Sequence, residues 1–225
     1  MSSTSTSRPT SLPSRASTRP AARSAARDRL AVAGLLALAA VPVAAGAVRL
    51  GDLGEITADN ARFVADPVPI VLHVVTATVY AVLGAFQFSR RIRRDHHAWH
   101  RRAGTVLVPT GVLVAASGLW MTAAYEVPAG DDGALALMRY AVGVAMLAQL
   151  TLAVVALARH RYASHGAWMT RAYALGMGAG TQVLSAGPTL ALADPPDWVR
   201  PVSMGAGWVL NVLVAEWVVA RRRHR

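Results

Sequence analysis

Residues 67–89 read PVPIVLHVVTATVYAVLGAFQFS and contain no Asp, Glu, Lys or Arg. An α-helix rises 1.5 Å per residue and the hydrocarbon core of a bilayer is about 30 Å thick, so about 20 apolar residues are enough for one crossing. The stretch has that length and brings no charge into the lipid. We therefore predict that it forms a membrane-spanning helix.

Five more stretches have the same character, and only the last contains a charged residue, Glu216. They cover residues 30–48, 103–125, 140–158, 172–193 and 201–220. The sequence therefore predicts an all-α, polytopic membrane helix bundle with six transmembrane helices. We expect a first span at 30–48, a four-helix core of spans two to five at 67–193, and the sixth span with a basic end at 201–225.

The composition agrees with this prediction. Hydrophobic residues make up 54% of the chain and charged residues 16%, whereas about a quarter of a typical soluble domain is charged. This balance argues against a water-soluble enzyme. The chain has no Cys, which excludes disulfides, thiolate nucleophiles, iron–sulfur clusters and Cys-based zinc sites. His, Met, Tyr and carboxylates remain as metal ligands.

All 23 basic residues are arginines, and the net charge is +11. Nineteen of them lie in the N-terminal tail, residues 89–102, residues 159–171 and the C-terminus, whereas nine of the 12 acids lie in the loops between. Cytoplasmic loops of membrane proteins carry such an arginine excess. We therefore predict a multi-pass plasma-membrane protein with both termini cytoplasmic, whose partner is the lipid bilayer and not nucleic acid.

Residues 1–29 are mostly Ser, Thr, Arg, Pro and Ala, with Asp28 as their one acid. They cannot bury enough apolar surface to fold, so we predict a disordered cytoplasmic tail. The apolar run at 30–48 exceeds the 7–15 residues of a signal-peptide core, which predicts an uncleaved first span. Cleavage after residues 45–47, Ala-Gly-Ala, is the alternative and would leave the other spans unchanged.

Ionisable side chains inside the apolar stretches are functional hypotheses, because a charge is costly in lipid. His73 lies about 9 Å into the second span, where it either bonds a neighbouring helix or belongs to a site. Arg139 and Glu216 lie near span ends and are expected to reach the interface.

A short repeat occurs on the arginine-rich side: HHAWHRRA at 96–103 matches HGAWMTRA at 165–172 as H-x2-W-x2-R-A. Trp beside Arg is typical of anchoring at a membrane interface, which leaves the histidines unexplained. Stripes of small residues follow: Gly104, Gly111 and Gly118 after His100, and Ala172, Gly176, Val183 and Gly187 after His165. The stripes predict that the third and fifth spans pack along their glycine faces, or that a flat cofactor fits there.

Three motifs carry a resemblance to a known family: His73 followed by GAFQF at 84–88, His100-x3-Gly104, and HGAWMTRAY at 165–173. Over roughly residues 68–185 the chain resembles the bacterial predicted membrane proteins of domain of unknown function family 2306. The resemblance implies a membrane fold and no activity. Its motifs select His73, His100 and His165, whereas the internal repeat aligns His165 with His96. The chain departs from the family at Thr105, Val106 and Leu107, where members tend to have Arg and Tyr.

Electron transfer through a b-type haem is the first functional hypothesis, since it needs His or Met ligands from facing helices and a groove of small residues. His100 and His165 open helices that run in the same direction, so they lie at similar depth and can share one haem beside Gly104. Arg102 and Arg171 would pair with its propionates. His73 is too far along its helix to join them and would belong to a separate site.

Two other classes stay open. One is a metal site of His100 and His165, with His96 as a further ligand and zinc as the ion, for which Asp95 is the nearby carboxylate in sequence. The other is a non-enzymatic transporter, or a scaffold that assembles with a membrane partner protein. Polar amides near mid-span and a glycine-rich fifth span that could be interrupted are typical of transporters. These amides are Gln149, Gln182 and Asn211.

Overall fold

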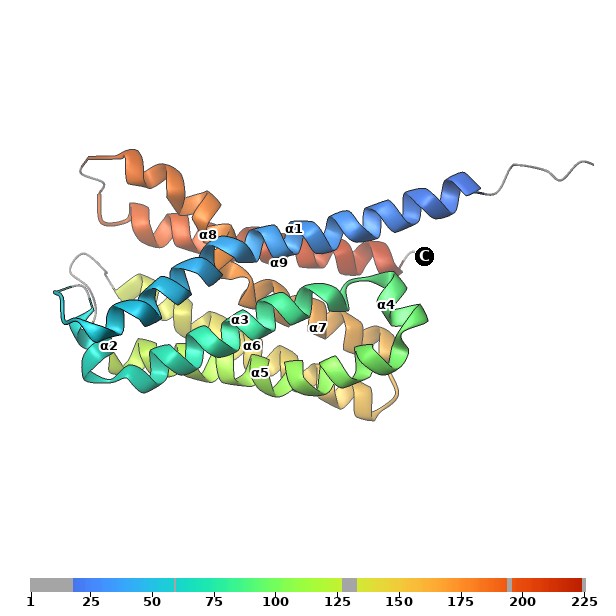
Figure 1. Cartoon of the computed structure of the whole chain (residues 1–225), viewed down its shortest axis with the longest axis horizontal. Helices are drawn as coiled ribbons and strands as arrows, with labels where there is room; N and C mark the ends of the chain where they lie inside the picture. Colours follow the sequence, from blue (N-terminus) through green and yellow to red (C-terminus); the bar gives the residue numbers. More distant parts are fainter. Residues whose placement is uncertain (1–17, 59, 127–132, 194–195, 224–225) are drawn as a thin grey trace, which may run out of the picture.

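A computed structural model describes residues 18–58, 60–126, 133–193 and 196–223, and this part of the chain is helical with no strand. The all-α prediction is confirmed. The longest helices lie side by side (Figure 1) and are α1 Thr18–Gly51, α3 Pro67–Gln87, α5 His97–Ala124, α6 Gly133–Ala158 and α9 Val199–Arg223. The other segments are η1 Asp52–Gly54, α2 Ala61–Ala65, α4 Arg90–Asp95, α7 Tyr162–Gly176, α8 Gly178–Ala186 and η2 Gly187–Ala191.

Five helices of the described residues are long and apolar enough to cross a membrane. They are Ala25–Gly54, Pro67–Gln87, His97–Ala124, Gly133–Ala158 and Val199–Arg222. Large apolar side chains such as Val144, Leu184 and Leu213 remain exposed on the bundle. An exposed apolar surface of this kind suits lipid and not water.

The stretch 172–193, which we predicted as the fifth span with an interruption as one alternative, is divided. α7 ends at Gly176, and Met177 has φ −82° and ψ 5°, so the helix is interrupted before α8 begins. The segment GMGAG at 176–180 has low helix propensity because of its three glycines. Asn211 Nδ2 donates to the Ala174 carbonyl at 2.9 Å, which supports the backbone next to the break. The six predicted continuous spans are therefore five, with an interrupted segment in place of the fifth.

The first helix also differs from the prediction. Residues 1–17 of the predicted tail lie outside the described residues, but α1 begins at Thr18 and not near residue 30. Alanine-rich sequence favours this extension, because alanine has the highest helix propensity. In addition, Asp28 accepts a hydrogen bond from the Ser89 hydroxyl at 2.6 Å, which holds this part of α1 against the start of α4.

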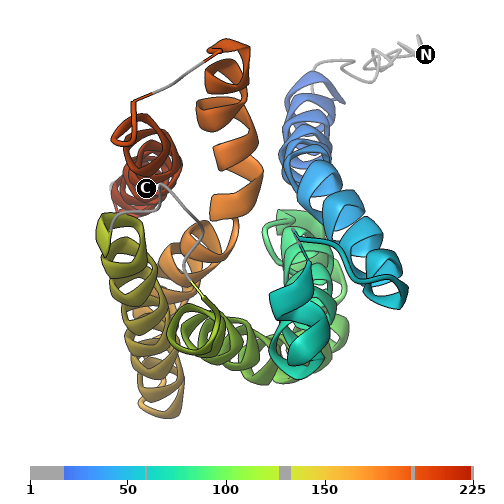
Figure 2. The same cartoon turned by 90° about the vertical axis from the view of Figure 1, so that its left-hand side faces the viewer.

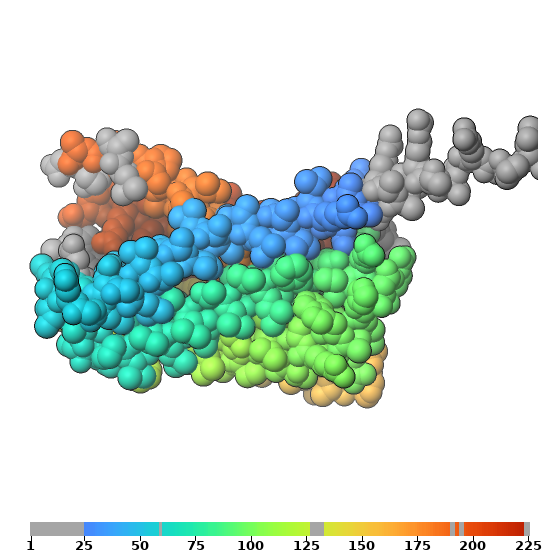
Figure 3. All heavy atoms as spheres, viewed as in Figure 1, coloured from blue at the N-terminus to red at the C-terminus, as the bar shows by residue number. Residues whose placement is uncertain are grey.

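The helices form a ring when viewed end-on (Figure 2). Contacts run from α1 through α3, α5, α6, α7 and α9 to α8, which packs against α1. In the space-filling view, α1 lies on the surface along α3 (Figure 3). We call the two ends of the bundle the α4 end and the α2 end, after the short helix found at each (Figure 1).

The buried core draws mainly on α3, α5, α6 and α7, the helices of the predicted four-helix core. It also includes Ala39 of α1. α8, the second half of the predicted fifth span, instead packs between α1 and α9. A Cβ on Gly180 would collide with the Leu38 carbonyl, so this glycine is what allows α8 to approach α1. The core therefore involves α1 more, and the fifth span less, than the sequence predicted.

Candidate functional site

Two tyrosine rings fill the centre of the bundle. Tyr80 of α3 and Tyr173 of α7 have ring centroids 5.7 Å apart and are 2% and 5% exposed. A Cβ on Gly111 of α5 would lie 2.7 Å from Tyr80, and one on Gly176 of α7 would lie 2.8 Å from it. The glycine faces that we expected to pack α5 directly against α7 therefore enclose the ring of Tyr80. A Cβ on Gly84 would collide with Tyr173 in the same way.

His73 lies nearer the α2 end and faces α5. Its Nδ1 is 3.1 Å from the hydroxyl of Ser117, which is 1% exposed. Because the Ser117 hydroxyl donates to the Leu113 carbonyl at 2.6 Å, its oxygen is free to accept from Nδ1. The expectation that His73 bonds a neighbouring helix is confirmed. Its ring also contacts α5 at Gly118.

His100 lies one turn into α5 at the α4 end and is partly buried. Its Nδ1 is buried and has no hydrogen-bond partner among the described residues. The ring contacts that of His97, with centroids 6.4 Å apart. His100 also interacts electrostatically with Arg93, His97 and His165. A buried ring nitrogen without a partner is available for a ligand.

His165 lies near the start of α7 and is held by α6. Its Nδ1 is 3.0 Å from the carbonyl oxygen of Ala153. A carbonyl only accepts hydrogen bonds, so Nδ1 carries the hydrogen, and in the neutral imidazole the lone pair is then on Nε2. Metal-ligating histidines commonly have their second nitrogen fixed in this way.

The structure therefore brings His100 and His165 within electrostatic range of each other and keeps His73 apart. His73 precedes Gln87, the last residue of α3, by 14 residues, or about 21 Å of helix rise. His96 is exposed at the N-cap of α5, where its carbonyl accepts from the His100 amide at 3.1 Å. This geometry favours His100 over His96 as the partner of His165.

The two arginines expected near a cofactor have different surroundings. Arg171 donates two hydrogen bonds to Glu216 of α9, at 2.5 and 2.7 Å, and its guanidinium lies over the ring of Trp168. Arg102 is exposed on α5. Sequence reasoning missed the pairing of Arg171 with Glu216, although Glu216 is the one charged residue in the last predicted span and could have been matched to an arginine at the same end.

The predicted metal site lacks ligands beyond His100 and His165. In the part of the chain that the structure describes, no group of three His, Cys, Asp or Glu side chains is placed to hold a metal ion. Asp95 pairs with Arg94 at 2.9 Å and with Arg91 at 3.9 Å. The hydrogen bond from Arg94 lowers the pKa of Asp95. A general base near neutral pH needs a higher pKa, so Asp95 is poorly suited to that role.

A second polar cluster lies at the interruption of the α7–α8 segment. The Thr181 hydroxyl donates to Asn211 Oδ1 at 2.7 Å, and Gln182 Nε2 donates to the Met204 carbonyl at 3.1 Å. Both α8 residues are buried against α9. Two of the three mid-span amides thus take part in hydrogen bonds between the interrupted segment and α9. The side-chain oxygen of the third, Gln149, is buried without a partner among the described residues.

The fold and the apolar helices define a multi-pass α-helical membrane protein. The family model described as "Predicted membrane protein (DUF2306)" matches residues 70–219, two thirds of the chain. The chain belongs to this family, which confirms the resemblance and extends it beyond residue 185 into α9. No curated protein and no solved structure matches the chain.

Proposed function

We propose that the protein is a redox membrane protein in which His100 and His165 hold a b-type haem at the α4 end. The electrostatic interaction between these two imidazoles, one on α5 and one on α7, carries the proposal. The hydrogen bond between His165 Nδ1 and the Ala153 carbonyl supports it, because it leaves Nε2 free to ligate. A haem bound there would accept and donate single electrons.

The donors suit a haem better than a bare metal ion. Two imidazoles are a complete axial set for haem, whereas zinc needs three or four protein ligands. A Cβ on Gly104, one turn after His100, would meet no atom within 4 Å, so α5 is open at this level. Deeper in the bundle the ring of Tyr80 fills the space beside Gly111. The cofactor would therefore lie at the level of His100 and Gly104.

Arg102 is the residue we propose for pairing with a propionate. Its side chain is exposed at the same end and forms no ion pair with the described residues. Arg171 is already held by Glu216, so it is less suited to the role that the sequence suggested.

An absorption spectrum of the purified, detergent-solubilised full chain tests this proposal. We expect a Soret band that is lost in both His100→Ala and His165→Ala and retained in His96→Ala, the matched exposed histidine. His73→Ala should also retain it, because His73 lies far along the bundle. A colourless wild-type protein, or a band that survives both His100→Ala and His165→Ala, would reject the proposal.

We also propose that the α4 end, with both termini, faces the cytoplasm across a plasma membrane, and that α7, α8 and η2 together make a sixth crossing. The arginine-rich segments at that end support this orientation. Because the chain has no Cys, single cysteines can report it. In intact cells a membrane-impermeant maleimide should label Thr57→Cys and Thr189→Cys but not Ala163→Cys. Labelling of Ala163→Cys alone would show that the protein has the opposite orientation in the membrane.

Transport is the second candidate function, and the interruption at Met177 favours it. Transporters bind substrates where helices are interrupted near the middle of the membrane. Thr181 and Asn211 offer polar groups at this break. If a water-filled path reaches it, Thr181→Cys should react with the impermeant maleimide, whereas Val212→Cys, an exposed position on the apolar part of α9, should not. Equal protection of both cysteines would argue against transport through the break.

A further inference from the structure

Three arginine side chains from two helices lie within electrostatic range of one another at the α4 end. Arg90 and Arg93 belong to α4, and Arg222 lies in the last turn of α9. Arg93 interacts electrostatically with Arg90, and Arg222 interacts with both. Two helices far apart in the sequence thus hold three positive charges within electrostatic range at the same end of the bundle.

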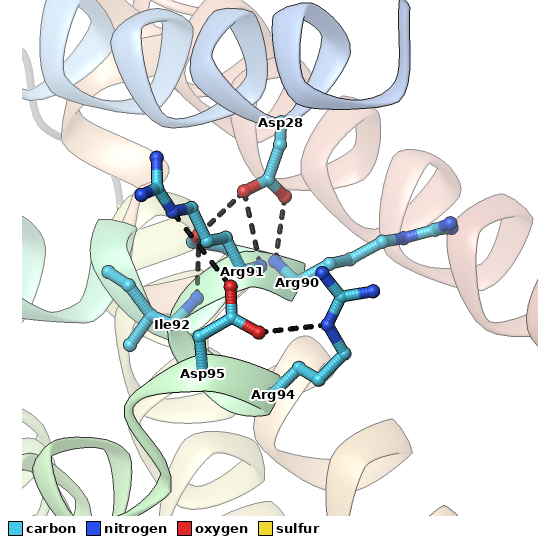
Figure 4. Close-up of polar contacts among 7 residues, drawn as sticks. Asp28, Arg90, Arg91, Ile92, Arg94 and Asp95 are labelled. Atoms are coloured by element: carbon cyan, nitrogen blue, oxygen red, sulfur yellow. Dashed lines mark hydrogen bonds and ion pairs between the residues drawn. The ribbon is translucent and has the colours of Figure 1, made fainter. Parts of the chain in front are cut away.

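The carboxylates of Asp28 and Asp95 neutralise this cluster only in part. Asp28 reaches from α1 to the first turn of α4, where it accepts from the main-chain amides of Arg90 and Arg91 at 2.7 and 3.4 Å (Figure 4). The side chain of Arg90 extends away from this carboxylate (Figure 4). Asp95 pairs with Arg91 and Arg94, and not with the arginines of the cluster.

Arg93 and Arg222 bond only to uncharged oxygens within the described residues. Arg93 donates to the Gln87 carbonyl at 3.3 Å, and Arg222 donates to the Thr170 hydroxyl at 3.3 Å. A guanidinium has five N–H donors, so most donors of these two side chains are available to a ligand. Burial and the charge of Arg90 lower the pKa of Arg93, and the charge of Asp28 offsets this only in part.

Like charges held together repel, and an anion placed among them removes that cost. The planar guanidinium matches the oxygens of a phosphate and can bind two of them at once. We propose that Arg90, Arg93 and Arg222 form a binding site for a phosphate group, supplied by the headgroup of an anionic phospholipid.

The position of the cluster favours a lipid as the source of the phosphate. The cluster lies where α3 and α9 end, and basic pockets between membrane helices at this depth bind anionic headgroups. Arg221, next to Arg222, lies 4.0 Å over the ring of Trp217, which is 55% exposed. An exposed Trp beside Arg is typical of the membrane interface. The proposal does not depend on a cofactor at His100 and His165.

A ligand titration of the full chain in neutral detergent tests the site, with the thermal unfolding midpoint as the readout. The probes are phosphatidylglycerol, phosphatidylcholine and inorganic phosphate. We expect phosphatidylglycerol to raise the midpoint to a plateau and phosphatidylcholine not to, because a ligand that binds the folded state stabilises it. The variant Arg93→Gln/Arg222→Gln should bind phosphatidylglycerol at least about tenfold more weakly.

The matched control is Arg101→Gln/Arg159→Gln, which removes two exposed arginines from the same end and should respond as the wild type does. An equal rise with inorganic phosphate would support the phosphate site and assign it to a free anion. Equal losses in both double variants, or no response of the wild type to either phosphate probe, would overturn the proposal. If Arg93→Gln/Arg222→Gln does not fold, the single variant Arg90→Gln should still show several-fold weaker binding than wild type.

Discussion

Arg171 of α7 and Glu216 of α9 form a two-pronged ion pair, with the guanidinium Nε and NH2 donating to the two carboxylate oxygens at 2.5 and 2.7 Å. The pair joins the start of the interrupted segment to the last long helix at the α4 end. The Arg171 side chain is 17% exposed and that of Glu216 is 49% exposed. Two parallel charged hydrogen bonds fix geometry as well as energy, so the pair sets how α7 lies against α9.

Arg171→Ala and Glu216→Ala should each lower the free energy of unfolding by about 1–2 kcal/mol, since Glu216 is half exposed and water weakens the attraction. A double-mutant cycle on the thermal midpoint in detergent measures the pair, and the double variant should cost less than the sum of the singles. Additive costs would mean that the two side chains stabilise the fold separately. Arg101→Ala is the exposed control and should change little.

Only Tyr173, and not Tyr80, should lose stability when its hydroxyl is removed. The Tyr173 hydroxyl donates to the Ala81 carbonyl at 2.7 Å, so Tyr173→Phe should destabilise the protein by about 1 kcal/mol. The Tyr80 hydroxyl is buried without a partner among the described residues, so Tyr80→Phe should be neutral or stabilising. Thermal midpoints of the two variants give the comparison, and an equal loss for both would show that Tyr80 has a partner, such as a buried water.

The fold could be predicted from sequence wherever a helix is defined by its own residues. α3 begins at Pro67, as predicted, and ends at Gln87, because an uncharged apolar run flanked by Asp66 and Arg90 determines both limits locally. The sequence indicated an interrupted fifth span only as an alternative and did not locate the break after Gly176. Hydropathy alone treats 172–193 as one apolar run. The group that supports the broken backbone, Asn211, lies on another helix.

The candidate site was predictable in the same limited sense. Two helices that start at the same end and run in the same direction placed His100 and His165 at the same end of the bundle, and the structure has them within electrostatic range of each other. Tyr80 was not singled out, because one aromatic residue on an apolar helix is ordinary core material. The spacing of His73, Tyr80 and Gln87, seven residues apart along α3, places all three on one face and was the available signal. The arginine cluster depends on electrostatic interactions between side chains of α4 and α9, which no local pattern encodes.

Asn211→Leu should destabilise the interrupted segment. The change removes the bonds to the Ala174 carbonyl and the Thr181 hydroxyl, and buried polar groups left unpaired cost about 1–3 kcal/mol. The control is the same kind of change at another mid-span amide, Gln149→Leu. The side-chain oxygen of Gln149 has no partner in the described part of the chain, so this variant should be neutral or stabilising. Limited proteolysis with thermal midpoints reports both, and a tolerated Asn211→Leu would show that the break needs no support from α9.

The enclosure of Tyr80 by two glycines predicts a position-specific effect of adding one methyl group. In Gly111→Ala and Gly176→Ala the new Cβ would lie 2.7 and 2.8 Å, respectively, from the Tyr80 ring. The ring cannot move away from either Cβ, because it lies between the two helices that carry these glycines. Overpacking of this kind costs about 1–3 kcal/mol. Gly104→Ala, in the same helix as Gly111, meets no atom within 4 Å and should gain up to about 1 kcal/mol from helix propensity. Thermal midpoints should therefore fall for the first two variants and hold or rise for the third. Tyr80→Leu should relieve much of the Gly111→Ala cost, and a cost that persists in the double variant would show that another contact of Gly111 causes it.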